Sequence, residues 1–174
     1  MIRLVLGGQC SGKTQAGLDF LMTDNGPHLL LATGQARDFG FRQQILDHKH
    51  ERPPNIAVIE PGLHMGQCLL DNADQWGAIL VDSLDFWLFT CQNSPYTEST
   101  TALAAFDACL ARWNTTARAH LTIISSETGL GLSPAHAASR QFVRELGKLN
   151  QKTAAHSDEA YFVAAGLRLP LKRT

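Results

Sequence analysis

Short apolar runs alternate with stretches of helical periodicity along almost the whole chain. The runs predict strands at residues 2–6, 28–33, 56–59, 78–81, 121–125 and 161–165, with a short edge strand at 167–171. The periodic stretches predict helices at residues 12–22, 36–47, 63–72, 83–90, 101–117 and 135–155. Strands that alternate with helices in this way form a wound sheet of mostly parallel strands. The pattern therefore predicts an α/β fold in three layers around a central sheet.

Three polar stretches interrupt this alternation. Residues 48–54 form a turn whose prolines cannot continue a helix, residues 92–99 are the most loop-like part of the chain, and residues 127–134 form a loop punctuated by glycine. Within the helix predicted at 101–117, an apolar stripe follows helical spacing: Leu103, Phe106, Leu110 and Trp113. We expect this stripe to pack into the core.

Length, composition and charge limit the class of protein. The 174 residues fit one domain, residues 1–174, and 44% apolar against 18% charged residues is enough to build a core. A net charge of −1 implies no general affinity for nucleic acid or for an anionic membrane surface. No apolar run approaches the roughly 20 residues of a membrane span. The four cysteines are far apart and form no C-x-x-C pair, so we expect reduced thiols in a cytoplasmic protein.

The turn after the first predicted strand carries the strongest chemical signal. It has the pattern G-x-x-x-x-G-K-[ST], followed by a predicted helix: Gly7, Gly8, Gln9, Cys10, Ser11, Gly12, Lys13 and Thr14. The glycines let backbone N–H groups turn around a phosphate, and the helix adds its positive N-terminus. Lys13 supplies a positive charge to the outer phosphates, and the Thr14 hydroxyl is placed to bind Mg²⁺. The sequence therefore predicts a P-loop that binds ATP or GTP.

Asp82 is the second candidate at this site. It follows the apolar run Ala78-Ile79-Leu80-Val81, where nucleotide-binding enzymes of this kind place the acidic residue that holds the metal. Asp is also a good N-cap, and residues 83–90 are predicted to be helical. We favour the Mg²⁺ role, and the two roles can coexist.

Four blocks of the sequence resemble the bifunctional adenosylcobinamide kinase/adenosylcobinamide-phosphate guanylyltransferase family. The first three are GGQCSGKT, then LATGQARD followed by ILDHKHERP, then ILVDSLDFWL. The fourth is SSETGLGLSPAHAASRQFVRELGKLNQKTAAHSDEAYFVAAGLRLPLK, whose E-x-G-x-G-x-x-P, R-x-F, G-x-x-N-Q and A-G-L segments match in order and spacing. Together the blocks span nearly the whole chain.

The resemblance implies two reactions on one scaffold and a homo-oligomer, expected to be a trimer. A nucleoside triphosphate phosphorylates adenosylcobinamide, and GMP from GTP then passes through a histidine to the phosphorylated corrinoid. Aligned on Arg52-Pro53, the histidine is His48, whose neutral imidazole can attack the α-phosphorus while Lys13 stabilises charge on the leaving pyrophosphate. Glu60 corresponds to an acidic position of the family pattern that could contact guanine or ribose, and a solvent-facing strand end before Pro61 is the alternative.

Two further residues in the fourth block are substrate-binding candidates. Glu127 begins the glycine-punctuated loop and is a candidate for a substrate or metal-water contact, with a favourable charge near a helix N-terminus as the alternative. Arg140 can reach a phosphate with two hydrogen bonds, and surface pairing with Glu145 or Asp158 is the alternative.

Other interpretations remain open for the active residues and for the whole chain. Without the resemblance, His48 reads as part of a solvated turn near a helix end, and His50 is its rival within the turn. The chain also departs from the family pattern, for example at Ser126 and His136, where asparagine is common. A small-molecule kinase without guanylyltransferase activity and a nucleotide-dependent regulatory protein are the two alternatives.

Overall fold

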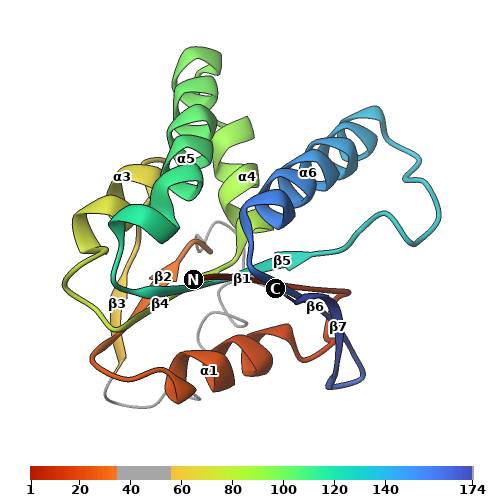
Figure 1. Cartoon of the computed structure of the whole chain (residues 1–174). Helices are drawn as coiled ribbons and strands as arrows, with labels where there is room; N and C mark the ends of the chain where they lie inside the picture. Colours follow the sequence, from red (N-terminus) through yellow and green to blue (C-terminus); the bar gives the residue numbers. More distant parts are fainter. Residues whose placement is uncertain (35–55, 174) are drawn as a thin grey trace.

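The structure is a computed structural model that describes residues 1–34 and 56–173. Its strands form one seven-stranded sheet with the order β3-β2-β4-β5-β1-β6-β7 (Figure 1). All neighbouring strands are parallel except β6 and β7, which form an antiparallel hairpin. The strands are β1 (Ile2–Gly7), β2 (His28–Ala32), β3 (Ile56–Ile59), β4 (Ala78–Asp82), β5 (His120–Ser126), β6 (Glu159–Ala164) and β7 (Leu167–Arg173).

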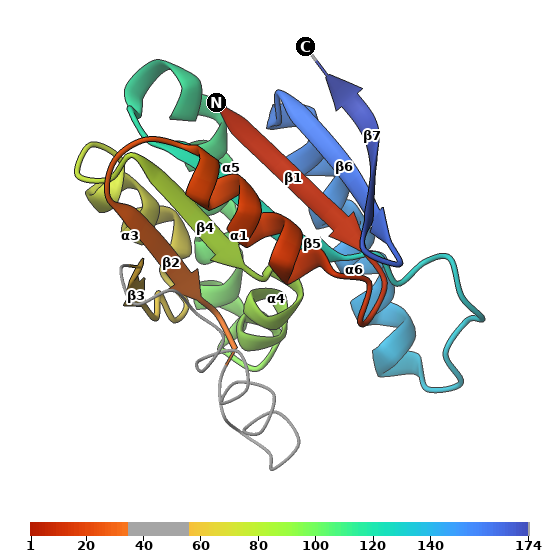
Figure 2. The ribbon, with the colours of Figure 1, turned by 90° about the horizontal axis from the view of Figure 1, so that it is seen from below.

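Helices cover both faces of the sheet, which makes the three layers that the sequence predicts. The described helices are α1 (Lys13–Thr23), α3 (Met65–Asn72), α4 (Leu84–Gln92), α5 (Tyr96–Thr116) and α6 (Ala137–His156). Helix α1 lies on one face, and α3, α4, α5 and α6 lie on the other (Figures 1 and 2). The predicted α/β fold with a mostly parallel sheet is therefore confirmed.

Each predicted strand and helix within the described residues is present, with ends shifted by a few residues. The helix predicted at 36–47 and the turn at 48–54 lie outside the described residues. The prediction of a loop over residues 92–99 is wrong at its second half, because α5 begins at Tyr96. The first turns of α5 are polar since they stand in solvent, where Thr100 and Thr101 donate hydrogen bonds to the carbonyl of Thr97.

The core lies on both faces of the sheet, because successive side chains of a strand point to opposite sides. Leu4 packs with the cluster under α3–α6, and its neighbour Val5 packs with the cluster under α1. The stripe predicted on the helix at 101–117 faces the larger cluster: Phe106, Leu110 and Trp113 are buried, and Leu103 is partly buried. In the described part of the chain, no helix combines the length and apolar character needed to cross a bilayer.

Candidate phosphate-binding site

The P-loop connects β1 to α1 at the carboxyl ends of the parallel strands, and its first glycine is tightly enclosed. A Cβ atom on Gly7 would lie 2.4 Å from the carbonyl oxygen of Val163 and 2.6 Å from the Ser11 hydroxyl. The Ser11 hydroxyl oxygen is buried and has no hydrogen-bond partner among the described residues. The loop therefore contains a buried hydroxyl beside Gly7 whose hydrogen bond is not made within the described residues.

The turn of the β6–β7 hairpin closes one side of the P-loop. The Gly166 amide donates to the Ser11 carbonyl at 2.9 Å, and a Cβ atom on Gly12 would lie 3.2 Å from the Gly166 Cα. Gly12 has a φ of 95°, which favours glycine, and it directly precedes α1. The hairpin turn itself places Ala165 and Gly166 at positive φ, as a two-residue turn requires. The P-loop, near the start of the sequence, is thus supported by a hairpin turn more than 150 positions later.

Lys13 begins α1 and folds back over the loop. Its ammonium donates to the Gly8 carbonyl at 2.7 Å, within the turn where a phosphate would be held. Burial lowers the pKa of Lys13, whereas the charges of Asp85 and Asp82, and a smaller contribution from Cys10, act to raise it. The ammonium is therefore hydrogen-bonded to the loop itself, and the carboxylates of Asp82 at the end of β4 and Asp85 in α4 act on its charge.

Asp82 is the last residue of β4, and β5 separates this strand from β1. Its charge acts on Lys13, so the structure brings these two predicted residues to the same site. The N-cap of α4 is Ser83, so capping by Asp82, the alternative role, is not observed. Thr33, at the end of β2, donates its hydroxyl to the Ser83 carbonyl at 2.7 Å. The chain that enters the undescribed segment therefore leaves from beside Asp82.

Asp85 is a residue of this site that the sequence analysis missed. It lies in the first turn of α4, and its Oδ2 accepts a hydrogen bond from the Ser126 hydroxyl at 3.0 Å. Of the groups whose charges raise the pKa of Lys13, Asp85 makes the largest contribution. The available signal was an acidic residue in the first turn of the helix that directly follows Asp82.

The side chains of the two substrate-binding candidates, Glu127 and Arg140, contact the loop between β5 and α6. The Glu127 amide donates to the Gly7 carbonyl at 2.9 Å, while its carboxylate accepts from the Gly129 amide at 2.6 Å. Since α6 begins ten positions later, Glu127 is not a charge in a helix N-terminus. Arg140 donates to the carbonyls of Pro134 and Ala135, and thus fastens the loop to α6 instead of making the predicted surface pair with Glu145 or Asp158.

Glu60 is not part of this geometry. Glu60 follows β3, at the far edge of the sheet and four strands from β1. At about 4.8 Å per strand, this is about 19 Å along the sheet. His48 lies outside the described residues.

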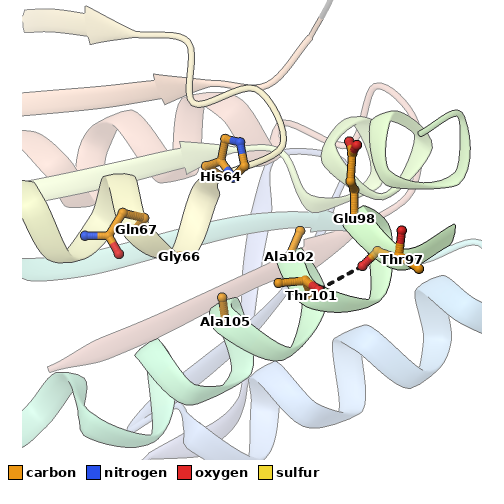
Figure 3. A pocket seen from close by; sticks show the side chains of 8 residues that line it. All are labelled: His64, Gly66, Gln67, Thr97, Glu98, Thr101, Ala102 and Ala105. Carbon is orange, nitrogen blue, oxygen red and sulfur yellow. Dashed lines mark hydrogen bonds between the residues drawn. The ribbon is translucent and has the colours of Figure 1, made fainter. Parts of the chain in front are cut away.

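A separate hollow lies between α3 and α5 (Figure 3). It is lined by His64, Gly66, Gln67, Thr97, Glu98, Thr101, Ala102 and Ala105, and its volume is about 310 Å³. His64 and Glu98 stand on opposite sides of its mouth, above a floor of small residues. None of these residues belongs to the P-loop, so this hollow is distinct from the phosphate site.

The fold and the loop together define a P-loop protein of the α/β class. The solved P4 protein from bacteriophage phi6 in complex with ADP has the same fold, with a TM-score of 0.50 and 13% identity over 96% of this chain. This chain spans about half (52%) of that longer P4 chain.

The sequence comparisons place the chain in a family. A profile described as "Cobinamide kinase / cobinamide phosphate guanyltransferase" matches residues 3–171, and the chain belongs to this family of enzymes. The bifunctional adenosylcobalamin biosynthesis protein CobP of Pseudomonas aeruginosa is 31% identical over 97% of this chain and 96% of its own length. Its counterpart CobU of Salmonella typhimurium is 27% identical over 99% of this chain and its own full length. The predicted family is therefore confirmed.

Proposed function

We propose that this enzyme phosphorylates adenosylcobinamide and then transfers GMP from GTP to adenosylcobinamide phosphate. The observation that carries the proposal is a complete P-loop, with Lys13 inside the turn, in a chain that matches the family over residues 3–171. Residues 7–14 hold the phosphates of the nucleotide, and Lys13 neutralises charge on the outer phosphates.

Mg²⁺ is the metal that the oxygen donors of this site fit. The Thr14 hydroxyl stands at the start of α1 and the Asp82 carboxylate at the end of β4. Hydroxyl, carboxylate and phosphate oxygens are the ligands that Mg²⁺ prefers. We assign Thr14 and Asp82 to hold the ion and its water, and the ion, when bound, supplies positive charge to the phosphates.

GMP transfer proceeds through His48 in this proposal. The neutral imidazole nitrogen attacks the α-phosphorus of GTP, so that a P–N bond forms, the bond to the β-phosphate oxygen breaks and pyrophosphate leaves. A phosphate oxygen of adenosylcobinamide phosphate then attacks the same phosphorus, and the P–N bond breaks. Thr33, which precedes the undescribed segment, shares two hydrogen bonds with Ser83, the residue directly after Asp82.

The mass of the intact protein after incubation with GTP and Mg²⁺ tests the covalent step. We expect one added GMP on the wild type and on His50→Ala, and none on His48→Ala. Adenosylcobinamide phosphate should then remove the adduct. An adduct that persists in His48→Ala and disappears in His50→Ala would transfer the role to His50.

The kinase reaction is tested separately with adenosylcobinamide and ATP or GTP. The plain small-molecule kinase predicts phosphorylation without any protein adduct. A regulatory nucleotide-binding protein predicts nucleotide binding with negligible turnover of either corrinoid. Lys13→Met should abolish both half-reactions in the proposed enzyme, because both place charge on phosphates that this ammonium faces.

The corrinoid and the quaternary structure complete the proposal. We assign Glu127 and Arg140 to the substrate side, and Glu60 to guanine or ribose, as the family resemblance implies.

We further propose a homo-oligomer, expected to be a trimer, and a cytoplasmic location. Exposed leucines on β7 support self-association, since Leu167, Leu169 and Leu171 are 75%, 60% and 56% exposed. All four cysteines are free, which fits a reducing compartment.

A further inference from the structure

The Asp85 carboxylate is enclosed but only partly hydrogen-bonded. Its Oδ2 accepts from the Ser126 hydroxyl at 3.0 Å, whereas its Oδ1 is buried and has no hydrogen-bond partner within residues 1–34 and 56–173. A buried carboxylate oxygen without a partner is costly, so a charged carboxylate here needs a compensating positive charge. Lys13 is a positive group on which Asp85 acts.

The fold fastens Asp85 to the strand that borders the P-loop. In the pairing of β1 with β5, Ser126 is opposite Gly7, the first residue of the loop. The next amide, that of Glu127, donates to the Gly7 carbonyl at 2.9 Å. The Ser126 hydroxyl therefore connects the carboxylate on α4 to the same backbone position from which the loop departs.

Hydrogen bonds from α6 restrain Ser126 as well. Asn150 of α6 is 6% exposed; its amide donates to the Ser126 carbonyl at 3.1 Å and its oxygen accepts from the Ser125 hydroxyl at 2.6 Å. Because the Asn150 side chain is held at both ends, the end of β5 has little freedom to shift. Hydrogen bonds thus lead from Asn150 on the buried side of α6 through Ser126 to Asp85, whose charge acts on Lys13 in the P-loop.

We propose that Asp85 is a positioning residue for Lys13: its carboxylate, fixed by the Ser126 hydroxyl, keeps the Lys13 ammonium inside the P-loop in place for the outer phosphates. Asp85 need not touch the nucleotide, because its free oxygen is enclosed. The inference rests on the proposed nucleotide binding at this loop. A carboxylate without this role would only repel phosphates, and its removal would then strengthen their binding.

The opposite signs of these two effects allow a direct test by nucleotide affinity. The probes are guanosine 5′-(α,β-methylene)triphosphate, whose α–β bridge His48 cannot cleave, and GMP, each with Mg²⁺, and the measured quantity is the ratio of their dissociation constants. We expect Asp85→Asn to reduce the preference for the triphosphate by about tenfold, since the electrostatic attraction between this carboxylate and the Lys13 ammonium is lost. Asp85→Glu should restore most of the preference. The matched control is Asp74→Asn, which removes an exposed carboxylate between α3 and β4, at the amino-terminal ends of the strands.

The Lys13→Met background distinguishes a positioning role of Asp85 from a purely structural one. If Asp85 acts through Lys13, Asp85→Asn adds no further change in the Lys13→Met background. Ser126→Ala should reduce the preference in the same direction by a smaller factor, and it tests the inference again if Asp85→Asn fails to fold. An unchanged or increased preference in the Asp85 and Ser126 variants, or an equal effect with and without Lys13, would overturn the inference.

The same experiment separates failure of this inference from failure of the proposed function. The affinity ratio requires binding but no turnover. A wild type that binds the triphosphate and transfers no GMP would refute the proposed guanylyltransferase reaction, and the variant ratios would still decide the role of Asp85. A wild type that binds no nucleotide would overturn both.

Discussion

Two neighbouring glycines at the start of the P-loop have different surroundings. A Cβ atom on Gly7 would collide with the Val163 carbonyl, whereas a Cβ atom on Gly8 would meet nothing within 4 Å. We therefore expect Gly7→Ala to lower the free energy of unfolding by about 1–3 kcal/mol, and Gly8→Ala to change it by less than about 1 kcal/mol. Urea denaturation of both variants measures the difference. Equal stability of the two variants would contradict the tight contact between the loop and β6.

The four cysteines are expected to react at very different rates. Burial raises the pKa of Cys91 to about 12 and that of Cys109 to about 11, so few thiolates form at neutral pH. Cys10, by contrast, is exposed in the P-loop. We expect N-ethylmaleimide to modify Cys10 first and GTP with Mg²⁺ to slow this reaction, with Cys91 and Cys109 modified only after unfolding. Mass spectrometry of peptides measures each site, and labelling of Cys10 that GTP leaves unchanged would count against nucleotide binding at the loop.

At the residue scale, the sequence predicts what depends on neighbours along the chain. Lys13 and Thr14 stand in a contiguous pattern, and Asp82 follows its strand directly, so all three are recognisable from local order. The role of Asp85 was not predicted, because its hydrogen-bond partner, Ser126, is 41 positions away in the sequence. The contacts of Arg140 with loop carbonyls were equally hidden, since a sequence gives no direction to a long side chain.

At the scale of elements, periodicity predicts the helices and strands well where one side of an element is buried. The stripe of the helix at 101–117 is an example, as it repeats Phe106, Leu110 and Trp113 against the core. The same method fails at the start of α5, because Tyr96 and the residues after it are mostly exposed and show no apolar stripe. In that part of α5, threonine hydroxyls donate hydrogen bonds to backbone carbonyls of the same helix.

Two helical glycines test how closely the elements pack. A Cβ atom on Gly66 of α3 would lie 2.8 Å from the backbone of Ala105 on α5, whereas one on Gly147 of α6 would meet nothing within 4 Å. We expect Gly66→Ala to destabilise the protein by about 1–3 kcal/mol by forcing α3 away from α5. Gly147→Ala should instead stabilise it by about 0.5–1 kcal/mol, because alanine is the better helix former. Thermal denaturation measures both, and stabilisation by both substitutions would refute the close approach.

At the scale of the whole molecule, the order of the strands was not predictable from the sequence. β1 lies between β5 and β6, and β2 lies between β3 and β4, although none of these pairings except β2 with β3 joins strands that are consecutive in the described order. Apolar runs predict that strands exist, but a parallel pairing depends on packing between distant segments. The contact between the P-loop and the β6–β7 hairpin follows from this order.

Hydrogen exchange tests that contact in the intact enzyme. The Gly166 amide is bonded to the Ser11 carbonyl, so a nucleotide that orders the P-loop should also protect the hairpin turn. We expect exchange of a peptide covering residues 161–170 to slow, by up to about 100-fold at a nucleotide concentration 100 times its dissociation constant. A peptide covering residues 66–77, at α3, serves as the control. Protection of the P-loop peptide alone would show that the two ends of the chain are not coupled.

The hairpin beside the P-loop also has a consequence for protein synthesis. Translation releases the glycine-rich turn well before the strands on both sides of β1 and before the hairpin turn. Until β6 and the hairpin have left the ribosome, the turn lacks part of its support. We therefore expect nascent chains that stop before β6 not to bind GTP.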